Sequence, residues 1–144
     1  MVLIDYEKTP VQNLLDLINA SSSVVFEETH LTFGTPVEIV SALPGNPNTS
    51  IIITATEDSL VAGTTPRKYR RIDIGEDFVD YLDVFEFSTG TSESTMLQYL
   101  IDQYDLHPDS TFTLTSALNN KKSFKPTAAD LLYCGERLVT ITLI

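Results

Sequence analysis

The chain of 144 residues contains one cysteine, no tryptophan and two histidines, and these shortages exclude several classes of protein. A single cysteine, Cys134, cannot form an intrachain disulfide, so a disulfide-stapled scaffold is excluded. Cys134, His30 and His107 lie far apart in the sequence, which leaves no spacing suited to a zinc site. No stretch approaches the roughly 20 apolar residues that span a bilayer, and residues 1–20 lack the pattern of a signal peptide. We expect no membrane contact.

The common motifs of catalysis and cofactor binding are also missing. The sequence contains no GxGxxG, P-loop, HExxH or EF-hand pattern. His30 falls within a predicted strand and His107 precedes Pro108 in a predicted loop, so neither adjoins a recognisable nucleophile and both are expected to be structural. The sequence therefore predicts no enzyme, no cofactor, no metal and no small-molecule substrate.

Positive charge is scarce, because 9 Lys and Arg residues stand against 20 Asp and Glu residues and give a net charge of −11. Such a surface repels phosphate backbones, so we expect no nucleic-acid partner. Four cations nevertheless cluster in one basic block: Arg67, Lys68, Arg70 and Arg71.

An acidic stretch follows the basic block directly and includes Glu76, Asp77, Asp80 and Asp83. Its spacing of three to four residues, with Gly75 before it, does not fit a calcium loop. We predict that the two blocks contact a partner, either another copy of the chain or a neighbouring protein. Internal ion pairing is the alternative.

Hydrophobic periodicity predicts two amphipathic helices. The first begins at Thr9-Pro10-Val11-Gln12, where Thr9 caps, Pro10 occupies the first turn and Gln12 completes a capping box; it should end near residues 19–21. The second spans residues 91–104, with Ser92 or Ser94 as its cap. Its apolar stripe comprises Met96, Leu97, Leu100, Ile101 and Tyr104.

Alternating residues predict strands between and after these helices. The predicted strands cover residues 22–33, 37–40, 50–56, 68–74, 84–87, 111–115 and 138–143, and the predicted loops cover residues 43–48, 62–66 and 119–125. The strand at 50–56 is apolar on both sides, which favours a central position, and in the last strand Val139, Ile141 and Leu143 should be buried.

The strands occur in groups and do not alternate strictly with helices, which favours an α+β fold with a mostly antiparallel sheet. We expect one domain over residues 1–144. The pattern of a helix followed by strands occurs twice, after LLDLIN and after LQYLID, and suggests two pseudo-repeated half-domains.

Several segments together resemble small virion structural proteins of large tailed bacteriophages. They are the helix VQNLLDLINASSS, the segment LTFGTP, the runs NTSIIITAT and RKYRRIDIG, and the C-terminal GERLVTITLI. The resemblance spans most of the chain and implies a virion component without catalysis. It supplies no functional residues.

The resemblance and the charge pattern favour the same function. We expect a non-enzymatic structural protein of the tail–baseplate or neck region, or a capsid-bound accessory protein, that is assembled in the host cytoplasm and contacts other virion proteins and copies of itself. The alternative is a small acidic cytoplasmic binding or adaptor domain.

Overall fold

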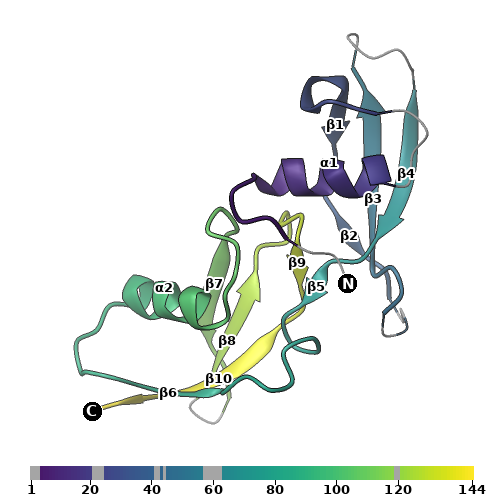
Figure 1. Ribbon diagram of the computed structural model, residues 1–144. Helices are drawn as coiled ribbons and strands as arrows, with labels where there is room; N and C mark the ends of the chain where they lie inside the picture. The colour runs from purple at the N-terminus through teal and green to yellow at the C-terminus, as the bar shows by residue number, and fades with distance from the viewer. Residues whose placement is uncertain (1–3, 21–24, 41–42, 44, 57–62, 119–120) are drawn as a thin grey trace. The chain divides into compact units, whose positions relative to one another are not determined.

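The computed structural model describes residues 4–20, 25–40, 43, 45–56, 63–118 and 121–144 (Figure 1). The chain divides into two compact units, Met1–Arg71 and Ile72–Ile144, which we call the N-terminal and C-terminal units. Each unit contains one α-helix and one four-stranded sheet, so the predicted α+β fold with mostly antiparallel pairing is confirmed. One domain over the whole chain remains a prediction.

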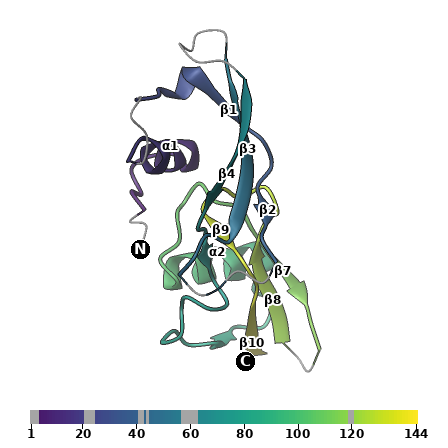
Figure 2. The same cartoon turned by 90° about the vertical axis from the view of Figure 1, so that its right-hand side faces the viewer.

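The N-terminal unit is built around one long strand. Its elements are α1 (Pro10–Ala20), the 3-10 turn η1 (Glu28–His30), β1 (Leu31–Phe33), β2 (Val37–Glu38), β3 (Thr49–Ala55) and β4 (Thr64–Tyr69). β4 pairs along one edge of β3, whereas β1 and β2 share the other edge, and every pair is antiparallel (Figure 2). The predicted central position of this strand is therefore confirmed.

The predicted start of α1 is also confirmed. The Gln12 amide donates to the Thr9 hydroxyl over 3.2 Å, and the Thr9 amide donates to the Gln12 side chain over 3.0 Å. The helix lies over one face of the sheet (Figure 2), where Leu14 and Leu15 are buried together with Ile51 and Ile53 of β3.

The C-terminal unit contains a second sheet in the order β6-β10-β8-β7. Its elements are β5 (Ile72–Asp73), β6 (Val84–Phe87), α2 (Glu93–Gln103), β7 (Phe112–Ser116), β8 (Lys121–Pro126), β9 (Tyr133–Cys134) and β10 (Arg137–Leu143). β6 runs parallel to β10, and the other pairs in this sheet are antiparallel. β5 and β9 form a separate parallel pair.

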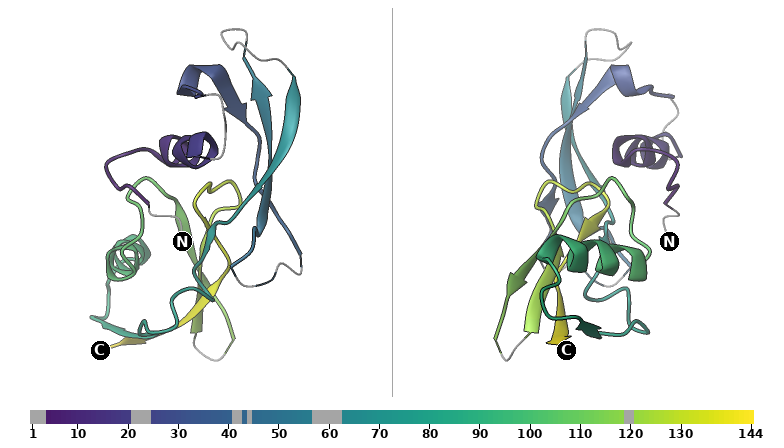
Figure 3. Two further views of the ribbon diagram at one scale, coloured as in Figure 1. Left: turned by 45° about the vertical axis from the view of Figure 1, so that its right-hand side comes forward. Right: turned by 90° about the vertical axis from the view of Figure 1, so that its left-hand side faces the viewer.

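Aromatic rings fill the core of the C-terminal unit. α2 lies over one face of its sheet (Figure 3). Phe124 lies at the centre, stacked on Tyr104 with ring centroids 5.8 Å apart and on Phe112 at 5.1 Å. Leu100 of α2 is completely buried in the same core. Ser92 caps α2 by accepting a hydrogen bond from the Thr95 amide, as predicted.

The two units share part of their connectivity. α1 is followed by the antiparallel series β1-β3-β4, and α2 is followed by the antiparallel series β7-β8-β10. β2 and β9 are short strands inserted into the two series. The parallel strand β6 belongs to the second unit alone, so the units share a helix and a three-stranded meander but not a complete topology.

Several predicted elements are wrong. Of the predicted strand at 22–33, residues 22–24 lie outside the described residues, and residues 25–30 contain the turn η1. The turn forms there because the Glu27 amide donates to His30 Nδ1 over 3.0 Å. Within the predicted loop at 62–66, residues 64–66 belong to β4. Within the predicted loop at 119–125, residues 121–125 belong to β8, because β7 and β10 pair with both of its edges. Leu143 is exposed.

Candidate interaction site

The basic block does not form one surface, because β4 ends at Tyr69 and the side chains of the block separate. Arg67 and Lys68 are exposed on β4, and Arg70 is half-buried with its guanidinium 3.4 Å from the Asn46 carbonyl. Arg71 is only 5% exposed.

Arg71 is therefore an internal structural residue, and its predicted role in partner contact is corrected. Its Nε donates to the Thr49 hydroxyl over 2.7 Å, and its backbone amide donates to the Asn48 side chain over 2.8 Å. The Asn48 amide group also donates to the Arg71 carbonyl over 2.9 Å. An Arg71→Glu substitution would place a carboxylate in a buried site that binds a cation, so it is expected to destabilise the fold.

A groove lies between α1 and the β3–β4 face of the N-terminal unit. It consists of two cavities of about 70 Å³ and 290 Å³ that share Ile18, Ile53 and Arg67 as walls. The other lining residues are mostly apolar: Leu14, Leu17, Phe26, Leu31, Ile51, Ala55, Gly63, Thr64, Thr65, Lys68 and Tyr69. We call this feature the groove.

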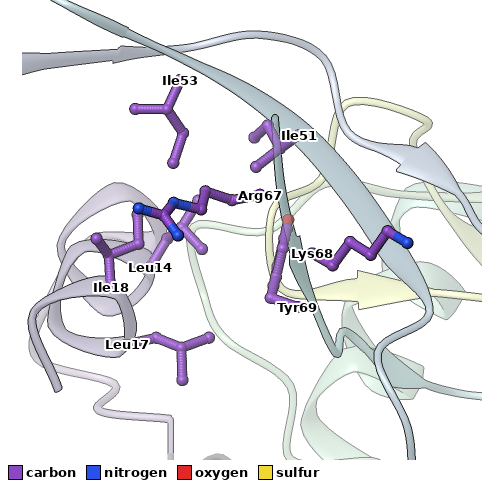
Figure 4. Close-up of a pocket in the computed structure, with 8 residues that line it drawn as sticks. All are labelled: Leu14, Leu17, Ile18, Ile51, Ile53, Arg67, Lys68 and Tyr69. Atoms are coloured by element: carbon purple, nitrogen blue, oxygen red, sulfur yellow. The ribbon is translucent and has the colours of Figure 1, made fainter. Parts of the chain in front are cut away.

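Among the lining residues that the structure describes, Arg67 is the charged residue whose side chain reaches across the groove. Figure 4 shows it extending from β4 towards α1, with its guanidinium beside Leu14 and Ile18, whereas the Lys68 ammonium points away. Among the described residues, the Arg67 guanidinium has no hydrogen-bond or ion-pair partner. A cation above apolar walls suits a ligand that carries both an apolar group and a carboxylate.

The predicted acidic residues lie on a loop of the C-terminal unit, residues 76–83, which we call the acidic loop. Glu76, Asp77 and Asp80 are exposed at its surface. Asp77 also accepts a hydrogen bond from the Asp73 amide over 2.8 Å. Asp83 accepts a hydrogen bond from Arg137 Nε at 2.5 Å and so forms an internal ion pair, while its side chain stays 48% exposed. Its role in partner contact stays a prediction.

Apolar side chains of the acidic loop project into solvent between the acids. Val79 is 80% exposed and Leu82 is 78% exposed. Their neighbours Phe78 and Tyr81 face the opposite way, with ring centroids 6.0 Å and 5.6 Å from the ring of Tyr104. The loop therefore presents two aliphatic side chains on a base of packed aromatic rings.

Arg137 anchors the acidic loop from within the C-terminal unit. Its guanidinium donates to the Ile74 carbonyl over 3.0 Å, to the Tyr81 carbonyl over 3.1 Å and to Asp83, and it lies 5.2 Å from the centroid of the Tyr104 ring. The Tyr104 hydroxyl donates to the Leu82 carbonyl over 2.8 Å. Burial raises the pKa of Tyr104 to about 12, so the phenol keeps the proton that this bond requires.

Two glycines permit this arrangement. A Cβ on Gly75 would lie 2.3 Å from the Glu136 carbonyl oxygen, and a Cβ on Gly135 would lie 2.2 Å from the Asp73 carboxylate. Gly135 also has a φ of +83°, which favours glycine. The close contact at the β5–β9 pair therefore fixes the start of the acidic loop.

One family model matches residues 4–126, more than half of the chain. It describes a family of unknown function, DUF7941. The chain belongs to the DUF7941 family. The DUF7941 match covers the groove and the acidic loop, and Arg137 lies beyond its end. No match was found among the curated proteins or the solved structures.

The structure also places the possible metal ligands of the chain, His107 and Cys134 among them. In the described part of the DUF7941 chain, no three His, Cys, Asp or Glu side chains are placed to hold a metal ion, and no helix is long and apolar enough to cross a bilayer. His107 is fully buried, its Nδ1 accepting from the Asp109 amide over 3.0 Å. Cys134 is buried as well.

Proposed function

We propose that this protein is a non-enzymatic structural component of a tailed-phage virion, placed in the tail–baseplate or neck region or bound to the capsid, and that it acts through protein–protein contacts. The observation that carries the proposal is the pair of surfaces just described, an open apolar groove and an anchored loop with projecting aliphatic side chains. Exposed apolar groups rimmed by charge are typical of surfaces that bind other proteins.

The sequence resemblance supplies the virion context, and the burial pattern agrees with a role at the surface. Three buried ionisable residues, Arg71, Arg137 and His107, each make hydrogen bonds within the chain. The exposed Val79 and Leu82 have no corresponding role in the core of the chain.

Particle composition tests the proposal. Particles of the virus that carries this gene are purified by two successive density gradients, and their proteins are quantified by mass spectrometry against the major capsid protein. We expect this chain at a fixed copy number that survives both gradients. Its absence from particles, with abundant chain in the cell lysate, would reject the virion role and favour the acidic adaptor domain instead.

A further inference from the structure

We propose that the groove of one copy of this chain receives the acidic loop of a second copy, with Val79 and Leu82 entering the apolar part and Asp80 pairing with Arg67. This inference rests on the proposed function, because it names the contact by which the chain would assemble.

The groove and the acidic loop are complementary in charge and polarity. The groove has apolar walls and one guanidinium without a partner among the described residues, in a chain whose net charge is −11. The acidic loop has the inverse pattern, two exposed aliphatic side chains with Asp80 between them. A carboxylate paired with an arginine forms a strong, charge-assisted hydrogen bond.

The volume of the groove suits the side chains of a partner protein. The larger cavity of about 290 Å³ lies at the lower limit of small-molecule sites, which are typically about 300–1,000 Å³. It has room for two aliphatic side chains of a partner protein. The size of the groove therefore matches a protruding loop that carries Val79 and Leu82.

The acidic loop is held in place by hydrogen bonds and ring contacts within its own unit. Arg137 and Tyr104 hold three of its carbonyl or carboxylate groups, and the rings of Phe78 and Tyr81 pack beneath it. A loop already held in one conformation loses little conformational entropy on association, so more of the contact energy contributes to binding.

Addition of a strand at the edge of β4 is a poorer explanation of assembly. Among the described residues β4 is an edge strand, but it contains Pro66, which has no amide hydrogen, and Lys68. Proline and lysine at a sheet edge discourage pairing with a further strand. The contact is therefore expected at the face of the sheet beneath α1.

A groove on one copy and a loop on the next make a heterologous contact, which closes into a ring or continues as an open chain. Substitutions at exposed residues test this contact. Arg67→Glu disables the groove, and the double variant Val79→Ser with Leu82→Ser disables the acidic loop. Lys125→Glu is the matched control, because it makes the same charge change on the exposed side of β8.

The assay is sedimentation of the purified full chain at concentrations from about 1 to 100 µM. We expect the wild type and Lys125→Glu to associate, and either disabled variant to show a dissociation constant about tenfold higher or more. A 1:1 mixture of the two disabled variants should form a dimer that grows no further, because one intact groove and one intact loop remain. Far-UV circular dichroism checks that each variant is folded.

A wild type that stays monomeric throughout, or association that both disabled variants preserve, would overturn the inference. Association that occurs only with a different particle protein would overturn it as well. A chain that is monomeric but present in particles would support the virion role and reject the contact between copies. A chain that self-associates but is absent from particles would support the contact and reject the virion role.

Discussion

Replacing Arg137 by methionine should destabilise the C-terminal unit and release the acidic loop. Methionine fills most of the same volume with an adaptable apolar side chain, so the change removes hydrogen bonds and leaves only a small cavity. The bond to the buried Ile74 carbonyl has a charged donor and is worth about 1.5–3 kcal/mol. The Tyr81 carbonyl and the Asp83 carboxylate can reach water, and Asp83 is 48% exposed, so each of those contacts contributes about 1 kcal/mol or less.

The expected loss in the free energy of unfolding is therefore about 2–5 kcal/mol. Urea denaturation followed by far-UV circular dichroism measures it. Near-UV circular dichroism adds a local readout, because the chain has six tyrosines and no tryptophan, and Tyr81 and Tyr104 both pack at the loop.

Two controls make this prediction specific. Lys125→Met removes an exposed cation and should change the free energy of unfolding by no more than about 0.5 kcal/mol. Arg137→Lys keeps the charge but loses the planar fork, so it should restore only part of the stability. A loss below about 1 kcal/mol for Arg137→Met, with an unchanged near-UV spectrum, would refute the anchoring role.

Three further predictions concern the two units. Leu100→Ala should lower the free energy of unfolding by about 2–5 kcal/mol in urea denaturation, because Leu100 is 0% exposed. Ile18→Ala should lower it less, because Ile18 is half-buried at the groove. Equal losses would contradict this difference in burial. Gly135→Ala should destabilise the chain more than Gly90→Ala. Both glycines have a positive φ, but of the two only Gly135 has other atoms within reach of an added Cβ. Similar melting temperatures for the two variants would contradict the close contact at Gly135. The pKa of Tyr104 is raised from 10.0 to about 12, so its contribution to stability should be complete below pH 10 and lost as the pH rises to 12. Absorbance titration at 295 nm should show one tyrosine that ionises late, and Tyr104→Phe should remove it. A late tyrosine that persists in this variant would show that the raised pKa belongs to another residue.

The elements with strong local signals were predictable from the sequence. The Thr9–Gln12 capping box and the Ser92 cap fix both helix starts within a few residues, and the run at Ile51–Ile53 identifies the central strand. β8 was missed because its sequence KKSFKP is mostly polar, and it becomes a strand only because β7 and β10 pair with both of its edges.

The candidate site was only partly predictable, because the decisive contacts join residues that are distant in sequence. The sequence grouped Arg67 and Arg71 in one basic block, but β4 ends before Arg71, and Asn48 and Thr49 bond to Arg71, which is buried. Nothing in the sequence around Arg137 indicated that it would hold Tyr81 and Asp83, more than fifty residues earlier. The sequence shows the opposite charges of Arg67 and Asp80, but it does not predict the apolar groove that Arg67 lines.

The most direct test of the contact between copies is a disulfide cross-link between two differently tagged chains. One chain carries Thr65→Cys in the groove and the other carries Val79→Cys on the acidic loop. The native Cys134 is buried, so the engineered thiols should dominate the reaction, and a disulfide needs Cα atoms about 4.4–6.8 Å apart. The account predicts a cross-linked heterodimer in the mixture, reduced at high salt, and none when Lys125→Cys replaces the loop cysteine. No heterodimer above the level of that control would contradict the account.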